Sequence, residues 1–162
     1  VARRALRRRD ERGARLGGRV GDNPNGPELG TVIVTPNACG AQDPLLGDFQ
    51  GPFKAHMCHR QSVLDLPKCA VVLASTRKEP CAAFSFSDCA WGVQFHPEFD
   101  SRILKVYVLH HKDELQARGV PVRDVFASCM ETGCGPEILR RFLWVVRKRD
   151  QFAGRRVLAS AV

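Results

Sequence analysis

The hydrophobic periodicity of the chain changes near Asp100, and this change limits the fold more than any other feature. Before it, β-branched and apolar residues form short runs between turn residues, which predicts strands. After it, apolar residues recur every three or four positions, which predicts amphipathic helices. The predicted strands are residues 31–35, 54–59, 70–75, 82–86 and 90–95, the last two as a hairpin, and the predicted helices run from Asp100 or Ser101 to near Gly119, from 122 to 130 and from 136 to 148.

Length and composition indicate one soluble globular domain. The 162 residues are 44% hydrophobic and 26% charged, which suits a folded core and is too apolar for a disordered chain. No apolar run approaches the roughly 20 residues of a membrane span, and the arginine-rich start lacks the apolar stretch of a secretory signal. We therefore expect a cytoplasmic protein with no membrane partner.

The net charge of +8 suggests a nucleic-acid partner until it is divided along the chain. Residues 1–19 and 139–162 each carry +6, whereas residues 20–138 carry −4. The basic residues thus belong to the two ends, so we expect no nucleic-acid partner. A basic nucleic-acid binder nevertheless stays open as the third function class. Three segments are predicted from this pattern: a basic, disordered or aberrant segment 1–15, a folded domain 16–150 and a basic tail 151–162.

The glycine- and proline-rich residues 17–27 predict a loop, so regular structure is expected to begin after them. Seven cysteines, an odd number without a CxxC pair, predict free thiols rather than disulfides. His56, Cys58 and His59 resemble metal ligands, but a strand would send His56 and Cys58 to one face and His59 to the other. No second pair of ligands accompanies them. We therefore predict no metal and no other cofactor.

The segment most informative about chemistry is the apolar run 91–95 followed by His96-Pro97-Glu98. In an extended chain residues i and i+2 project to the same face, so His96 and Glu98 are expected to lie side by side at the end of a strand. A carboxylate beside an imidazole sets its tautomer and stabilises its protonated form, as a proton-transferring base requires. The simpler interpretation is an exposed ion pair, which would have the same spacing.

The wider sequence favours the catalytic interpretation. The run Gly92-Val-Gln-Phe-His-Pro-Glu98 resembles a signature of class I glutamine amidotransferases, whose triad is Cys-His-Glu. Other segments resemble that family in the same order: 16–21 its helix end after the nucleophile, 30–32 the next strand, 43–46 its Asp-Pro-Leu-Leu turn, and 59–67 its His-x-x-x-Val…Leu-Pro loop. The resemblance covers about residues 16–115, and the helices after it are similar to those of stand-alone members such as the GMP synthase glutaminase.

This resemblance implies a fold and a site. The fold is expected to be α/β, a part of the flavodoxin-like amidotransferase fold with a mixed sheet, a β-hairpin and C-terminal helices. His96 is expected to act as the base and Glu98 to orient it. His59, Gln61 and Ser62 correspond to the family's loop on the glutamine side, and we expect that loop near the same end of the sheet. The implied partners are glutamine or a γ-glutamyl compound and an ammonia-accepting synthase domain or subunit.

The family's nucleophile, a cysteine in Gly-x-Cys-x-Gly-x-Gln, has no counterpart at the expected place. Counting back from residues 16–18 puts that place near Leu6, among arginines. Cys39-Gly40-Ala41-Gln42 imitates part of the motif but follows the matching strand. We predict that no cysteine of the chain replaces the nucleophile and that the chain alone does not hydrolyse glutamine.

Two further function classes stay open besides the nucleic-acid binder. One is a glutamine amidotransferase, or a relative such as a γ-glutamyl peptidase, of which this chain supplies the His-Glu part. The other is a non-catalytic remnant that serves as a binding or regulatory module. Without the first strands of the fold, the central sheet would have an exposed edge. We therefore also expect the isolated chain to be unstable or to associate.

Overall fold

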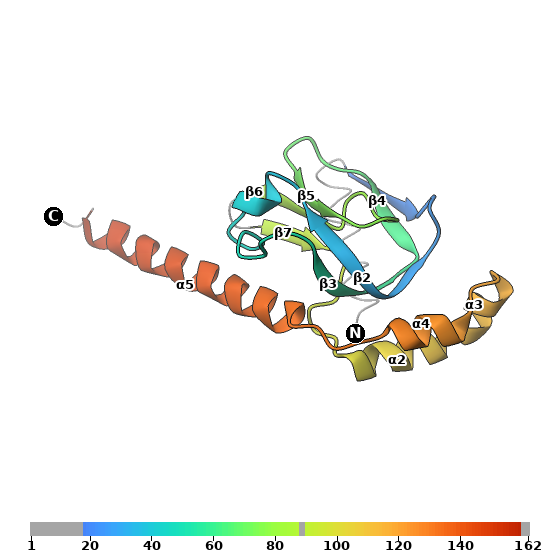
Figure 1. Ribbon diagram of the computed structural model, residues 1–162. Helices are drawn as coiled ribbons and strands as arrows, with labels where there is room; N and C mark the ends of the chain where they lie inside the picture. Colours follow the sequence, from blue (N-terminus) through green and yellow to red (C-terminus); the bar gives the residue numbers. More distant parts are fainter. Residues whose placement is uncertain (1–17, 88–89, 160–162) are drawn as a thin grey trace.

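The computed structural model describes residues 18–87 and 90–159, and the structural statements below refer to these residues. Predictions about residues 1–17, including the position near Leu6, and about Cys89 lie outside them. Strands fill the first part of the chain and helices the second, as the periodicity predicted (Figure 1). The elements are β1 Arg19–Asp22, β2 Glu28–Pro36, η1 Gly40–Gln42, β3 Phe53–His59, β4 Gln61–Asp65, β5 Val71–Ser75, β6 Ala83–Ser87, β7 Ala90–Val93, α2 Ser101–His110, α3 Lys112–Ala117, α4 Val122–Ser128 and α5 Cys134–Ala159.

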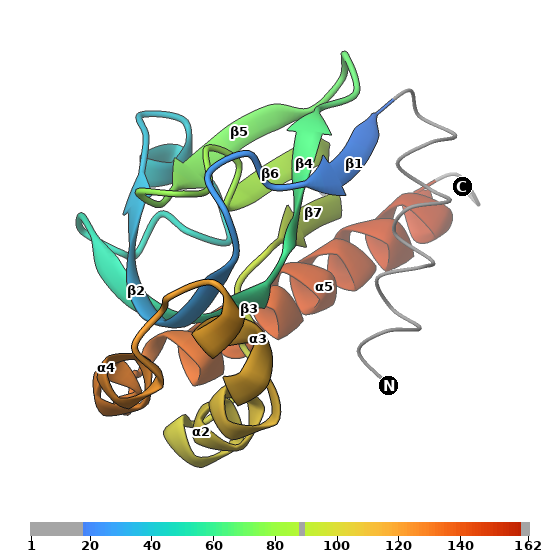
Figure 2. The same ribbon diagram turned by 90° about the vertical axis from the view of Figure 1, so that its right-hand side faces the viewer.

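The main sheet of the described chain has the strand order β3-β2-β5-β6-β7, and β1 pairs with β4 in a separate two-stranded ribbon (Figure 2). Each of these pairings is antiparallel, so the parallel pairing of a mixed sheet is not found among the described strands. A bridge between Met57 and Phe95 joins β3 to the segment that follows β7. The sheet therefore curls until its first strand lies beside the chain that leaves its last strand, and this contact positions the candidate site.

Two hydrophobic cores lie on either side of this sheet. The first contains Val34, Leu46, Met57 and Phe95 and is closed by Ile138 at the start of α5. The second lies beneath α2, α3 and α4 and includes Leu104, Val108, Leu115 and Cys129. Burying a large aliphatic side chain contributes about 1.5–3 kcal/mol. Each core therefore holds a different set of helices against the strands that carry the site.

The Asp-Pro-Leu-Leu turn fastens the first core to β7. The Asp43 carboxylate accepts hydrogen bonds from the backbone N–H groups of Leu45 and Leu46, at 2.8 and 3.3 Å. Its other oxygen accepts one from the indole N–H of Trp91, at 2.9 Å. Leu45 and Leu46 are themselves buried. One carboxylate thus closes the turn and ties it to the strand that leads to His96.

The α/β class, the hairpin of β6 and β7 and the C-terminal helices are confirmed. The expectation that regular structure begins after residue 27 is wrong, because residues 19–22 form β1 and pair with β4. The prediction that residues 59–62 form a loop is also wrong, since β3 ends at His59 and β4 begins at Gln61. Short strands with exposed polar residues lack the alternation that a sequence pattern detects.

The helical region departs from expectation in two places. The first predicted helix is interrupted at His111, which separates α2 from α3. The last begins at Cys134 rather than Pro136 and extends away from the sheet in the view of Figure 1. In the described part of the chain, no helix is both long and apolar enough to cross a membrane.

Candidate active site

The backbone that leads into His96 is fixed by close packing on β7. A Cβ atom at Gly92 would lie 2.2 Å from the ring of Phe84, so only glycine allows this ring to cross β7 there. Phe95 is buried in the first core. The backbone N–H of His96 then donates to the carbonyl oxygen of His56 at 2.8 Å. The histidine is therefore held against β3 by its own main chain.

His96 and Glu98 form the hydrogen-bonded pair that the His-x-Glu spacing predicted. The Nδ1–H of His96 donates to Oε1 of Glu98 at 3.0 Å. The ring stacks on Phe99 with centroids 4.2 Å apart and planes 11° from parallel. Because a carboxylate accepts the Nδ1 proton, the neutral ring carries its lone pair on Nε2. The side chains are 16% and 56% exposed, so the ring is sheltered and its partner meets solvent.

The chain beyond Glu98 is also anchored. Asp100 caps α2 by accepting from the backbone N–H of Ile103 at 2.7 Å, and this bond lowers the pKa of its carboxyl group together with the bond from Arg102. The hydroxyl of Ser101 donates to Glu131. A Cβ atom at Gly135 would lie 2.3 Å from the carbonyl oxygen of Pro97. The His-Pro-Glu segment is thus fixed between β3, the start of α2 and the start of α5.

A second histidine, His56, lies behind this pair on β3. It is 3% exposed, and its Nδ1 is 3.2 Å from the hydroxyl oxygen of Thr31. Burial lowers its pKa; the charges of Glu131 and Asp100 oppose that effect and His96 adds to it. The neutral form of His56 is therefore favoured, next to the backbone bond that holds His96.

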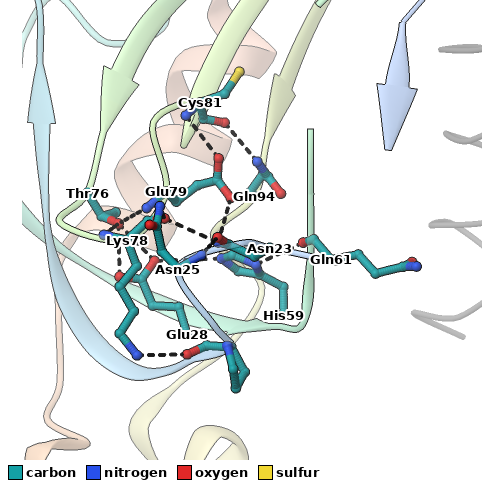
Figure 3. A network of polar contacts seen from close by, with 11 residues as sticks. Asn23, Asn25, Glu28, His59, Gln61, Thr76, Lys78, Glu79, Cys81 and Gln94 are labelled. Atoms are coloured by element: carbon teal, nitrogen blue, oxygen red, sulfur yellow. Dashed lines mark hydrogen bonds and ion pairs between the residues drawn. The ribbon is translucent and has the colours of Figure 1, made fainter. Parts of the chain in front are cut away.

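The third part of the candidate site, after the His96–Glu98 pair and His56, is the segment 59–62, shown with its neighbours in Figure 3. The Nδ1–H of His59 donates to the carbonyl oxygen of Gln61 at 3.0 Å, and its Nε2 lies 3.6 Å from the Glu28 carboxylate. The side chain of Gln61 is exposed and extends away from this network (Figure 3), whereas Ser62 is buried at 2% exposure. Among the three predicted site residues His59, Gln61 and Ser62, Gln61 is the exposed one.

The structure brings His96 to β3 but keeps it apart from His59. The bridge between Met57 and Phe95 continues to His96 opposite His56, three residues before His59 on the same strand. Three residues of strand span about 10 Å. Because side chains alternate along a strand, His56 and His59 point to opposite faces. β3 therefore connects the His96–Glu98 pair to the segment 59–62 without placing the rings of His96 and His59 in contact.

The cysteines of the described chain are free thiols. Burial raises the pKa of Cys58 to about 11 and those of Cys81 and Cys134 to about 12, with Glu79 adding to the effect at Cys81. Burial also raises the pKa of Cys129. Such thiols stay protonated at neutral pH, and the thiolate is the nucleophilic form. Within the described residues, no group of histidine, cysteine or acidic side chains could hold a metal ion.

Glu28, Thr76 and Glu79 belong to the polar network near His59 and were not singled out from the sequence. Glu28 and Glu79 are buried at 6% and 0% exposure, although isolated acidic residues in a sequence normally indicate solvent-facing positions. No spacing rule links residues 28, 59 and 76. The register of β2 with β3 brings Glu28 opposite His59, and that pairing is visible only in the folded chain.

Comparison with known proteins identifies the family of the chain. The model of the family described as glutamine amidotransferase class-I matches residues 13–113, which include the His-Pro-Glu segment. The chain belongs to the class I glutamine amidotransferase family. It is 41% identical over 83 residues to the GMP synthase [glutamine-hydrolyzing] of Aeropyrum pernix, a match that covers 51% of this chain and 15% of that protein.

Two further relatives extend the comparison. Gamma-glutamyl peptidase 3 of Arabidopsis thaliana is 32% identical over 95 residues, covering 54% of this chain and 36% of the peptidase. A solved glutamine amidotransferase from Thermotoga maritima superposes with a TM-score of 0.64 at 25% identity, covering 81% of this chain and 55% of that one. The chain thus spans well under two thirds of each of these relatives.

Proposed function

We propose that this chain provides the histidine–carboxylate part of an active site that hydrolyses the side-chain amide of glutamine. The observation that carries the proposal is the hydrogen bond from the sheltered His96 ring to Glu98, in the segment that follows β7 and lies within the family match. The pair has the geometry of a general base held by an orienting carboxylate. The curated relative from Aeropyrum pernix, a GMP synthase named as glutamine-hydrolysing, supports this choice of substrate.

In the proposed reaction Nε2 of His96 accepts a proton from a cysteine thiol, and the thiolate attacks the amide carbon of glutamine. As the tetrahedral intermediate collapses, His96 returns that proton to the departing nitrogen, which leaves as ammonia. Water, deprotonated by the same nitrogen, then cleaves the thioester to give glutamate and the free thiol. Glu98 keeps Nδ1 protonated throughout, so that Nε2 is the nitrogen that exchanges the proton.

We propose that the nucleophile comes from polypeptide outside this chain. The raised pKa values of the buried thiols Cys58, Cys81 and Cys134 argue against their use. Cys39 is exposed, next to the short helix η1, and has no histidine among the partners described for it. The predicted absence of glutaminase activity in the chain alone follows from this, because losing a nucleophile typically costs several orders of magnitude in rate.

Complementation tests the proposal. The purified chain is mixed with the part of the Thermotoga maritima relative that lies outside the structural match, and ammonia release from glutamine is measured. We expect ammonia release by the mixture and only background release by either part alone. His96→Ala should lower the mixture's rate by about 10²–10⁴-fold. Equal release by the mixture with and without His96 would contradict the assignment of the base.

A γ-glutamyl peptidase-like hydrolase is the second candidate, because the match to the Arabidopsis peptidase covers 36% of that protein against 15% for the GMP synthase. Both candidates use the same acyl transfer and differ in the leaving group. The mixture is therefore also given a γ-glutamyl dipeptide. Faster release of the amino acid than of ammonia from glutamine would favour the peptidase.

A further inference from the structure

The chain contains a second histidine–carboxylate pair, which the reaction proposed above does not use. The Nε2 atom of His59 lies 3.6 Å from Oε2 of Glu28, and both side chains are 7% exposed. Figure 3 shows the pair beneath the loop of residues 76–79, among polar side chains from several segments. A carboxylate this deeply buried requires hydrogen bonds or an opposite charge to offset its lost hydration.

Thr76 supplies these hydrogen bonds and connects Glu28 to a tight turn. Its hydroxyl oxygen is 2.8 and 2.9 Å from the two carboxylate oxygens of Glu28 and donates to them. The same oxygen accepts from the backbone N–H groups of Lys78 and Glu79, at 3.2 and 2.9 Å. Thr76 therefore holds the Glu28 carboxylate that lies near His59.

The other ring nitrogen of His59, Nδ1, connects the Glu28–His59 pair to the backbone of β4. The Nδ1–H donates to the carbonyl oxygen of Gln61 at 3.0 Å, and the N–H of Asn23 donates to the carbonyl of Arg60, also at 3.0 Å. In a trans peptide the N–H points opposite to the carbonyl oxygen. Holding the carbonyls of Arg60 and Gln61 therefore also fixes the directions of the N–H groups of Gln61 and Ser62.

We infer that Glu28 is a positioning residue for the segment 59–62, and this rests on the proposed glutaminase function together with the family resemblance, which implies that residues 59–62 lie on the glutamine side of the site. Glu28, held by Thr76, lies within ion-pair distance of the His59 ring and attracts that ring when it is protonated, while Nδ1 of His59 binds the backbone at Gln61. Replacing a buried ion pair by apolar side chains often leaves stability unchanged, so a buried pair of this kind is weak evidence for stability. A role in fixing the conformation of the segment is our hypothesis for it. The substrate would meet Gln61, whose side chain is exposed, while Glu28 stays buried behind it.

Amide hydrogen exchange of the intact chain tests whether Glu28 holds the segment. In Glu28→Met, which keeps a buried side chain of similar length, we expect the amides of residues 60–62 to exchange about tenfold faster while those of β2 and β3 are unchanged. Asp65→Asn is the matched control, because it removes an acidic charge from the exposed end of β4 and should leave these rates unchanged. Unchanged rates at residues 60–62 in Glu28→Met would overturn the inference.

Thr76→Val decides the question if Glu28→Met does not fold. This variant keeps the shape of the side chain and removes the hydroxyl, which holds Glu28 and also accepts from the N–H groups of Lys78 and Glu79. The same amides should again exchange faster, and unchanged rates would overturn the inference. L-Glutamine is then titrated against wild-type and variant chains while the amide signals of residues 60–62 are followed by NMR. We expect about tenfold weaker binding in the variants; equal binding would show that Glu28 has no role in substrate positioning. Absence of binding in the wild type would overturn the substrate role of the segment, whereas the exchange rates would still decide whether Glu28 holds it.

Discussion

His96 is restrained at three different atoms or surfaces. Its backbone N–H is bound by His56, its Nδ1–H by Glu98, and one ring face by Phe99. A general base works best when its orientation is fixed before the substrate arrives. In the reaction proposed above, the ring nitrogen opposite Glu98 exchanges the proton, so the proposed contribution of this chain depends on the orientation of this single side chain.

The buried His56 makes stability depend on pH. Its pKa is lowered from 6.5 in the folded chain, mainly by burial, against the opposing charges of Glu131 and Asp100 and with a contribution from His96. Above 6.5 the residue is neutral in both states. As the pH falls below 6.5, the unfolded chain takes up the proton first, so the free energy of unfolding should decrease until the folded pKa is passed.

The measurement is urea unfolding at about pH 7.5 and about pH 5.5. His56→Gln, which cannot titrate, should lose less stability than the wild type between these two values. His110→Gln serves as the control, because His110 is exposed on α2 and its removal should leave the difference unchanged. A wild-type slope that persists in His56→Gln would show that another group is responsible.

At the scale of elements, the start of α5 limits where the His-Pro-Glu segment can lie. Gly135 packs against the backbone of Pro97 so closely that a Cβ atom would be 2.3 Å from its carbonyl oxygen. Both partners are backbone, so neither can move aside as a flexible side chain could. We expect Gly135→Ala to destabilise the chain by about 1–3 kcal/mol despite the better helix propensity of alanine.

Thermal unfolding and the NMR signals of His96 check this prediction. The signals of the His96 ring should shift in Gly135→Ala, since Pro97 is displaced with the helix. Gly133→Ala is the matched control because a Cβ atom at Gly133 would meet nothing within 4 Å, and it should change stability by less than about 1 kcal/mol. If both variants behave alike, the contact with Pro97 has no energetic importance.

The sequence predicted long, strongly patterned elements and the local pair, and it failed where contacts are distant. β2, β3, β5 and the hairpin follow from runs of β-branched and apolar residues, and the His96–Glu98 bond follows from a spacing of two. β1 and β4 were not predicted because each depends on pairing with the other, 46 residues apart at Arg19 and Asp65. The burial of Glu28 beside His59 depends on strand register in the same way.

At the scale of the molecule, α5 exposes an apolar stripe. Leu139, Phe142, Leu143 and Val146 recur at helical spacing and are each at least 40% exposed, while Ile138 and Val145 on another face are buried against the body. An exposed stripe of this kind promotes association. We expect the isolated chain to self-associate, consistent with the instability or association predicted from the sequence.

Sedimentation of the purified chain at several concentrations measures this association. Phe142→Glu places a charge in the middle of the stripe and should shift the chain toward the monomer. Gln116→Glu adds the same charge on an exposed position of α3 and should leave the distribution unchanged. A wild-type chain that sediments as a single monomeric species at all concentrations would contradict the prediction.

β3 contacts both the His96–Glu98 pair and the segment 59–62, and this has a consequence for how the chain tolerates changes in length. His56 on this strand binds the backbone of His96, and His59 three residues later binds the carbonyl of Gln61. Inserting or deleting one residue between them would turn one of the two histidines to the wrong face. Length variation among homologous chains should therefore be concentrated in the connections before β3 and after β4, such as residues 48–52 and 66–70, and be absent from residues 56–59.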